Sequence, residues 1–328
     1  MKKLRGLMVS VPIALLLVVL MGCAGTPAEN SGVSAPEAGS GDEVADQAWP
    51  RTIIDAAGHE VTLEKAPSRI VVVHFSDMEY MLALDAPLIG AGFAESRIAM
   101  WDTLEPYRGK GIVDIGSSAA PNLEKILELD PDLIIGNISF NADIYDELRK
   151  IAPTVNLGGY TTWEDRLKAT AEVIGKENEA AEYQEKTHQL LADSRGKLSS
   201  YSDQTFASLR ITSSEQKTME LLGSKELGAY YSSERGLGLK APDQYPETWQ
   251  SATMEGIAVM DPDYILLHAD SKTAYDEFTQ WGSQQSVWSN LKAVKNGHVI
   301  YLNMSVWSGS PRAIELAAQN IVAGVIEN

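Results

Sequence analysis

Short runs of apolar residues alternate along the chain with segments that have helical spacing. The β-branched run at 69–73 predicts a strand buried on both faces, and the run at 88–91 predicts a second strand. Residues 78–84 between them have one apolar face, which indicates a helix. Residues 53–63 contain a glycine turn and predict a small hairpin. Strands that alternate with helices are typical of a parallel, right-handed α/β layer.

One part of this pattern occurs twice. PNLEKILELDPDLII at 121–135 and ATMEGIAVMDPDYIL at 252–266 each predict a helix, a turn at Asp-Pro-Asp and a buried strand. Glu124 in the first copy recurs as Glu255 in the second, 131 positions later. The second half also predicts strands at 209–212 and 299–302 and a terminal helix at 313–326. We therefore expect two related α/β lobes.

A long helical segment separates the two copies. After Gly175 the chain keeps helical spacing, with no proline and no glycine until Gly196. A helix of about 22 residues would be roughly 33 Å long, enough to run along both lobes as a stiff connection. We expect an N-terminal lobe at 51–160, an interdomain helix region at 161–199 and a C-terminal lobe at 200–328.

The first 23 residues have the pattern of an exported lipoprotein. Cations within residues 2–5 precede an apolar run at 7–21, which is shorter than the roughly 20 residues of a bilayer span. The run ends in Leu-Met-Gly-Cys, and Cys23 is the only cysteine of the chain. We expect residues 1–22 to be a signal peptide and Cys23 to carry a lipid. Residues 23–50 then form a disordered linker from an anchor on the extracytoplasmic face of the cell membrane, in a Gram-positive-type envelope.

The charge of the chain excludes some partners. Without the three cations of the signal peptide, 24 Lys and Arg remain against 45 Asp and Glu, a formal charge of −21. So acidic a surface argues against binding to nucleic acid or adsorption to anionic lipid.

Several stretches resemble a known family: APSRIV at 66–71, PNLE at 121–124 with DPDLI at 130–134, IAPTV at 151–155, and VWSNLKAVKNGHV at 287–299. In this order, behind Leu-Met-Gly-Cys, the chain resembles the substrate-binding proteins of ABC importers for iron(III)-siderophores, haem and cobalamin. The resemblance covers nearly all of residues 51–328. It implies a periplasmic-binding-protein fold, in which a rigid helix joins two lobes around a ligand cleft, and we expect a monomer.

The resemblance also implies a role for the repeated glutamates. Family members present one glutamate from each lobe to arginines of a dimeric permease, and the matching positions here are Glu124 and Glu255. Two separated charges can orient a rigid protein on a two-fold partner. The alternative is that both are solvated acids that favour the start of a helix.

Candidate ligand-binding residues follow the predicted strands or lie in the loops between the lobes. Ligands of such folds bind beyond the carboxyl ends of the strands. These candidates are His74, Trp101, Tyr231, Arg235, Trp249, His268, Trp307 and Arg312.

The residue types favour a ligand that brings its own metal. A bare metal ion needs three or four converging donors, and only His74 and His268 are expected near the cleft. Haem stays open, because His74, His268, Tyr230 or Tyr231 could be an axial ligand. A siderophore needs only aromatic walls and a few donors, so we expect no metal ligands and no cofactor in the protein.

Scattered basic residues favour a neutral ferric hydroxamate, with ferric citrate-type ligands next. Some hydroxamate binders of the family carry an arginine three positions before the proline of the repeated motif, where this chain has Ser118. We therefore do not expect the contact that this arginine makes at the iron site. The rival functions are haem or cobalamin binding, a surface sensor, and an enzyme. The sequence carries no nucleophile elbow, phosphate-binding loop or paired-histidine zinc helix, so we expect no enzyme.

Overall fold

The computed structural model describes residues 49–213 and 217–327, in which two five-stranded sheets each form the centre of a lobe. The predicted signal peptide, Cys23 and most of the predicted linker lie outside these residues. A small antiparallel hairpin comes first, formed by β1 (Arg51–Ile54) and β2 (Glu60–Leu63), as the glycine turn predicts.

The N-terminal sheet is entirely parallel and has the order β5-β4-β3-β6-β7. Its central strand is the β-branched run, and every residue of that strand is buried. The strands are β3 (Ile70–Val72), β4 (Leu88–Ala91), β5 (Val113–Asp114), β6 (Leu133–Asn137) and β7 (Thr154–Leu157). Sequence analysis predicts β3, β4 and β6, whereas β5 and β7 are additional strands at the two edges.

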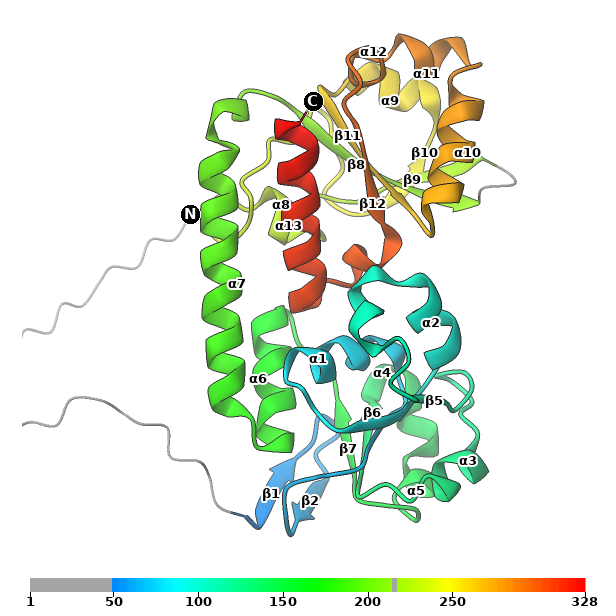
Figure 1. Cartoon of the computed structure of the whole chain (residues 1–328), viewed down its shortest axis with the longest axis vertical. Helices are drawn as coiled ribbons and strands as arrows, with labels where there is room; N and C mark the ends of the chain where they lie inside the picture. Colours follow the sequence, from blue (N-terminus) through cyan, green and yellow to red (C-terminus); the bar gives the residue numbers. More distant parts are fainter. Residues whose placement is uncertain (1–48, 214–216, 328) are drawn as a thin grey trace, which may run out of the picture. The chain divides into compact units, whose positions relative to one another are not determined.

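Helices cover both faces of this sheet (Figure 1). Separate apolar clusters fill the two faces, one with Met78, Met81 and Leu167, the other with Ile126 and Leu148. The helices of this lobe are α1 (Met78–Ala83), α2 (Ala94–Met100), α3 (Leu123–Glu128), α4 (Ile138–Asn141), α5 (Tyr145–Leu148) and α6 (Trp163–Ile174).

The C-terminal sheet is mixed and has the order β10-β9-β8-β11-β12. β11 is parallel to β8 and β12, but β9 is antiparallel to β8 and β10. This lobe therefore departs from the all-parallel expectation, because β8 turns back into β9 instead of entering a crossover helix. The strands are β8 (Phe206–Ser213), β9 (Thr218–Leu221), β10 (Gln250–Ala252), β11 (Tyr264–Ala269) and β12 (Val299–Asn303).

Helices cover both faces of the second sheet as well. One face packs on α8 (Gly228–Tyr231) and α13 (Pro311–Ile326), whereas the other is filled by side chains such as Phe278 and Trp288. The helices on that second side are α9 (Met254–Met260), α10 (Lys272–Gly282), α11 (Ser286–Asn290) and α12 (Lys292–Lys295). The two-lobed α/β fold class is thus confirmed.

The repeated phrase folds in the same way in both lobes. Each copy forms a short helix, α3 or α9, and an aspartate with positive φ follows within two residues of its end, Asp130 (46°) or Asp261 (37°). The following aspartate accepts hydrogen bonds from the segment ahead of the central strand. Asp132 accepts from the backbone N–H groups of Ser68 and Arg69, and Asp263 from both the N–H and the hydroxyl of Thr205.

These hydrogen bonds hold both carboxylates in their charged form. Partial burial raises the pKa of Asp132, but the hydrogen bonds from Ser68 and Arg69 outweigh it and lower the pKa below the ordinary value. The pKa of Asp263 is lowered in the same way by Thr205 and Lys292, against partial burial. In both lobes, the second aspartate of the repeat therefore binds the segment that precedes the central strand to the segment that precedes its neighbour.

The long helix α7 (Glu177–Lys197) is present and packs against both lobes (Figure 1). On the N-terminal side His188 lies 3.1 Å from Glu164 of α6. On the C-terminal side Tyr183 and Thr187 bond Glu315 of α13 at 2.9 and 3.2 Å. Near its end, Arg195 donates to three backbone carbonyl groups of the loop at 232–238, those of Ser233, Glu234 and Gly236.

A second junction connects the lobes next to η5 (Met304–Ser308), the 3-10 turn after β12. Thr103 is central to it. Its N–H donates to the Ser305 hydroxyl at 3.3 Å, and its carbonyl accepts from Nε of Arg312 at 3.0 Å. Asn303 donates to the carbonyl of Met100 at 3.2 Å.

A buried carboxylate, that of Glu79 on α1, lies within this junction and is 0% exposed. Burial raises its pKa to about 7, although hydroxyl groups of Ser308, Thr103 and Ser310 and the charge of Arg166 act in the opposite direction. A raised pKa means that the folded chain binds the proton more tightly than the unfolded chain. Stability from this group is therefore fully present below pH 4.5 and is lost as the pH rises through about 7.

We predict that Glu79→Gln removes this loss, because the amide has the shape of the carboxylate without its charge. When the pH is raised from 5 to 8, the melting temperature of the wild type should fall by several degrees more than that of the variant, since one pKa unit corresponds to about 1.4 kcal/mol. Thermal unfolding at the two pH values measures this difference. Glu128→Gln, at an exposed acid on α3, is the control and should follow the wild type. An equal pH dependence in Glu79→Gln and wild type would contradict the assignment.

Candidate functional site

The order of strands in the N-terminal lobe locates a crevice. From the central strand β3 the chain first adds β4 and β5 on one side, then β6 and β7 on the other. The helices that follow the two neighbours β3 and β6 therefore diverge, which leaves a crevice beyond the carboxyl ends of these strands. Side chains in and after these strand ends are the first candidates for a binding surface.

An aromatic patch occupies this edge. We use this name for His74 and Phe75 after β3, Phe93 after β4, Phe140 in α4, and Trp101 after α2. The His74 ring stacks on Phe75 and Phe140 at 4.5 and 4.2 Å, and Phe75 meets the edge of Trp101 at 5.3 Å. Phe93 and Phe140 are 36% and 55% exposed, so the patch offers apolar surface to a ligand.

His74 is a neutral member of the patch. Burial lowers its pKa, and the cationic charges of Arg166 and Arg97 lower it further against the opposing effect of Asp77. Its Nδ1 lies 2.7 Å from the Ser76 hydroxyl, which fixes the orientation of the ring. The histidine therefore supplies a stacking surface more than a charge.

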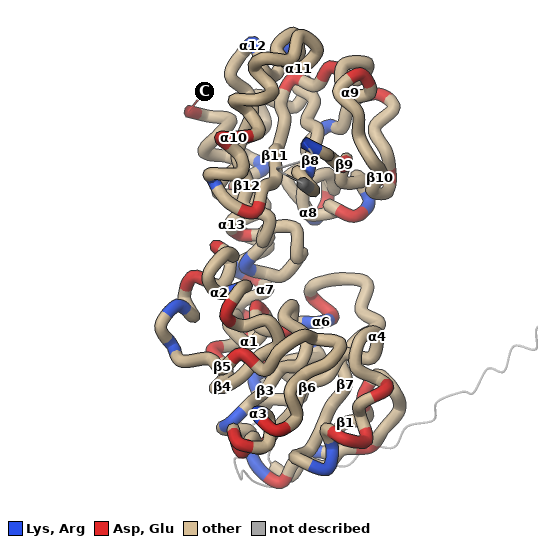
Figure 2. Tube along the Cα trace, turned by 90° about the vertical axis from the view of Figure 1, so that its right-hand side faces the viewer, with Lys and Arg blue, Asp and Glu red and all other residues tan. Residues whose placement is uncertain are grey.

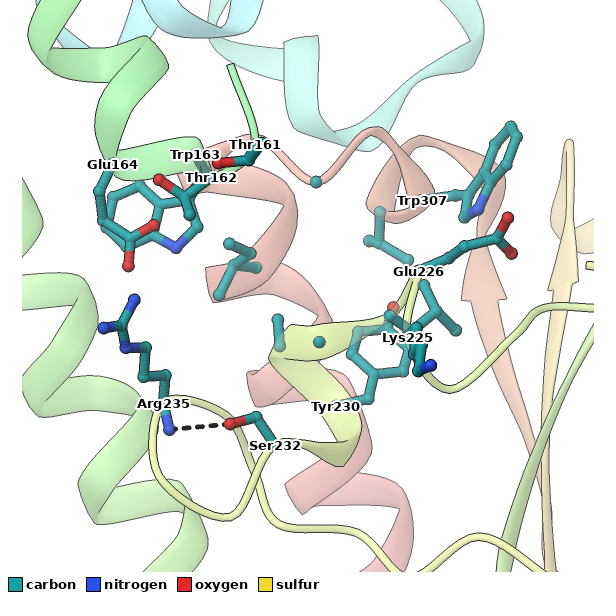
Figure 3. A pocket seen from close by; sticks show the side chains of 16 residues that line it. Thr161, Thr162, Trp163, Glu164, Lys225, Glu226, Tyr230, Ser232, Arg235 and Trp307 are labelled. Carbon is teal, nitrogen blue, oxygen red and sulfur yellow. Dashed lines mark hydrogen bonds between the residues drawn. The ribbon is translucent and has the colours of Figure 1, made fainter. Parts of the chain in front are cut away.

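A pocket of about 390 Å³ lies between the two lobes (Figure 3). Its volume is within the usual range of small-molecule sites. Its lining residues come from the segment after β7, from α8 and its flanks, and from η5 and α13: Thr161–Glu164, Lys225–Tyr230, Ser232, Arg235, Val306, Trp307, Gly309 and Ile314. We call it the interlobe pocket.

Arg235 and Trp307 give this pocket its polar and aromatic character. Figure 3 shows the Arg235 guanidinium directed toward Trp163 and Glu164 across the pocket. Trp307 is 39% exposed, and the Arg210 guanidinium carbon lies 4.4 Å from its ring centre. Arg210 also forms an ion pair with Glu220 of β9, so its charge is compensated within the protein.

Tyr230 and His268 form the buried wall behind the pocket. Tyr230 lines the pocket, and its ring is nearly parallel to that of His268 at 6.1 Å. His268 is 0% exposed, and burial followed by the charge of Arg210 lowers its pKa to about 3. The imidazole is therefore neutral, and the Tyr230 ring separates it from the pocket.

Three other candidates have different surroundings. Tyr231 directs its hydroxyl to the carbonyl of Phe206 at 3.1 Å, so it braces the second sheet while its neighbour Tyr230 lines the pocket. Arg312 bonds Thr103 at the lobe junction. Trp249 is 55% exposed just before β10 and is absent from the lining of the interlobe pocket.

Among the residues of these surfaces, sequence reasoning did not single out Phe93, Arg97 or Trp163. The apolar run at 88–91 followed by a helical segment could have placed Phe93 and Arg97 at the carboxyl edge of the sheet. Trp163 opens α6, and its role in the pocket depends on how the two lobes meet, which no local pattern specifies.

The described residues contain no cluster of three or more His, Cys, Asp or Glu side chains arranged to hold a metal ion. Nor is any helix within 49–213 and 217–327 long and apolar enough to span a bilayer.

Comparison with known proteins decides the family. A family model described as periplasmic binding protein matches residues 61–305. This chain belongs to the periplasmic binding protein family. It is 31% identical to the probable siderophore-binding lipoprotein YfiY of Bacillus subtilis, over 90% of this chain and 92% of that protein. It is 27% identical to the Fe(3+)-citrate-binding protein YfmC of Bacillus subtilis, over 90% of each chain.

The fold agrees with solved members of the family. The crystal structure of the petrobactin-binding protein YclQ from Bacillus subtilis aligns with a TM-score of 0.67 at 23% identity, over 85% of this chain and 99% of that one. The predicted membership is thus confirmed, and the family consists of substrate-binding proteins. The relatives of this chain include proteins named as lipoproteins.

Proposed function

We propose that this protein captures an iron(III)-siderophore outside the cytoplasm and delivers it to the permease of an ABC importer. One observation carries the proposal: the interlobe pocket, lined by Trp163, Tyr230, Arg235 and Trp307, opens between two lobes of a periplasmic binding protein. Relatives that align over 90% of the chain are named for siderophore and ferric citrate binding.

The chemistry of the pocket fits a chelated metal better than a bare one. In a siderophore the chelator already fills the coordination sphere of iron, so the protein needs to recognise only the organic surface. Aromatic rings pack on that surface, and the fork of Arg235 can donate to its oxygens. We infer a binding protein rather than an enzyme, with no resident cofactor.

Lipid attachment at Cys23 completes the proposed arrangement. A lipid on Cys23 and a linker to residue 50 would keep the lobes beside the membrane that contains the permease. The relatives include proteins named as lipoproteins, which supports this anchor. We propose that the protein acts there as a monomer.

The permease contact is proposed for Glu124 and Glu255. Each is exposed and is the second residue of its helix, α3 or α9. The N-cap side chains Asn122 and Thr253 already accept the third helical N–H, at 3.0 and 3.1 Å. The glutamates are thus not needed as caps and are available to a partner. Their helices belong to different lobes, on the side away from α7 (Figure 1).

Ligand capture should quench tryptophan fluorescence of the full chain, because a ferric complex close to an indole ring accepts its excitation energy. We predict saturable quenching by a ferric siderophore and much less by its iron-free form. Trp307→Phe should remove a large part of the signal, since Trp307 lines the interlobe pocket. Trp249→Phe is the matched control, because Trp249 is exposed outside that lining and should leave most of the signal.

The titration should include a ferric hydroxamate, ferric citrate, a ferric catecholate, haem and cobalamin. Saturation by haem or cobalamin alone would replace the proposed cargo with another ligand of the same transporter class. Failure of every ligand to bind would contradict the proposed function.

Charge reversal should separate capture from delivery. We predict that Glu124→Arg with Glu255→Arg abolishes uptake of radioactive iron by cells, because like charges would face the arginines of the permease. The ligand affinity of the purified variant should stay within about twofold of wild type, since both residues are remote from the pocket lining.

Glu182→Arg with Glu185→Arg gives the same change of net charge at exposed positions on α7, away from α3 and α9, and should leave uptake intact. Normal uptake by the Glu124 and Glu255 double variant would show that these glutamates do not dock the protein.

A further inference from the structure

Arg97 is a cation held among rings of the aromatic patch. Its guanidinium carbon lies 4.7 Å from the ring centre of Phe75, 5.0 Å from that of Trp101 and 5.9 Å from that of Phe93. Three rings around one guanidinium remove much of its water and attract its charge. They also limit the directions from which another molecule can approach it.

No acidic side chain within 49–213 and 217–327 neutralises this cation. No Asp or Glu forms an ion pair with Arg97 among the described residues, and its buried Nε has no hydrogen-bond acceptor there. A guanidinium always carries its charge and has five N–H donors. A partly buried arginine without an acidic partner destabilises the fold unless an anion from another molecule pairs with it.

Other cations near the cleft already have protein partners. Arg210 pairs with Glu220, Lys225 with Glu247 at 2.7 Å, and Arg166 with Asp77. Arg235 is exposed in the C-terminal half of the pocket lining. Figure 2 shows Lys and Arg positions scattered along the trace of both lobes. A few separate cations can each meet one carboxylate of a ligand.

We propose that Arg97 determines specificity by binding a carboxylate of the ferric ligand. The protein would then prefer a carboxylate-bearing chelate of the citrate type to the neutral hydroxamate favoured by sequence alone. A carboxylate matches the guanidinium fork with two parallel hydrogen bonds, whereas a neutral hydroxamate complex offers no full charge. This inference rests on the proposed function, because it concerns which siderophore the protein takes.

The position of Arg97 supports contact with a ligand. It lies in α2, one turn before Trp101 at the lobe junction, and the rings around it belong to the aromatic patch at the carboxyl edge of the sheet. A ligand in the crevice beyond β3 and β6 would meet this patch first. Phe93, which precedes α2, has a φ of 54°, a conformation that aromatic residues rarely adopt and that directs the chain into this turn.

Affinities of the full chain for ferric citrate and for ferrichrome, a neutral ferric trihydroxamate, test this proposal. We expect the wild type to bind ferric citrate more tightly. Arg97→Gln should lower the affinity for ferric citrate about 30-fold and the affinity for ferrichrome less than about threefold. Hydrogen bonds to charged groups are stronger than those to neutral groups. The affinity of Arg97→Lys for ferric citrate should lie between those of the wild type and Arg97→Gln, because lysine keeps the charge and lacks the forked guanidinium.

Arg149→Gln is the matched control. It removes the same charge from an exposed arginine of the same lobe that lies 2.8 Å from Asp146, and it should change neither affinity. Melting temperatures of all variants identify loss of folding. If Arg97→Gln does not fold, the Arg97→Lys affinities decide the question.

Different failures have different meanings. Tighter wild-type binding of ferrichrome, an equal loss for both ligands in Arg97→Gln, or no loss for ferric citrate would each overturn the role of Arg97 while leaving siderophore binding intact. Absence of binding to these two ligands and to a ferric catecholate would overturn the proposed function itself, and this inference with it.

Discussion

The attachment of α7 to both lobes is the constraint on which the binding surfaces depend. His188 contacts Glu164 on one side, Tyr183 and Thr187 share Glu315 on the other, and Arg195 holds the loop at 232–238. Glu164 and the loop residue Arg235 both line the interlobe pocket. The same helix that joins the lobes therefore also positions residues on two sides of the pocket.

A rigid connection agrees with the work that a capture protein performs. Binding requires a surface that is already formed, because ordering side chains and loops consumes part of the interaction energy. The junction at Thr103, Ser305 and Arg312 resists separation of the lobes at one end, and α7 resists bending along their length. Only a small hinge motion is expected from such an arrangement.

Much of the fold could be predicted because its signals are local. The β-branched strand at 70–72, the uninterrupted helix at 177–197 and the paired Asp-Pro-Asp turns each depend on neighbouring residues. The antiparallel pairing of β8 with β9 could not be foreseen, since residues 218–221 carry no strong strand pattern. Edge strands as short as Val113–Asp114 depend on the sheet that is already present.

The site was only partly predictable for a related reason. Strand ends led to His74, and an interlobe loop led to Arg235, but sequence cannot show which of two adjacent tyrosines faces a pocket. Tyr230 does so because the hydroxyl of Tyr231 bonds the backbone of β8. Arg97 was missed because it was chosen for the absence of an acidic partner among the described residues. Only the three-dimensional structure shows such an absence.

A distance between the lobes, measured with and without ligand, tests the rigid connection most directly. Spin labels at Glu147→Cys and Glu277→Cys, both exposed, report on the two lobes in a Cys23→Ala background without other thiols. Electron paramagnetic resonance should give one narrow distance distribution that shifts by less than about 3 Å when a ferric complex saturates the protein. A broad distribution without ligand, or a shift several times larger on binding, would contradict the account.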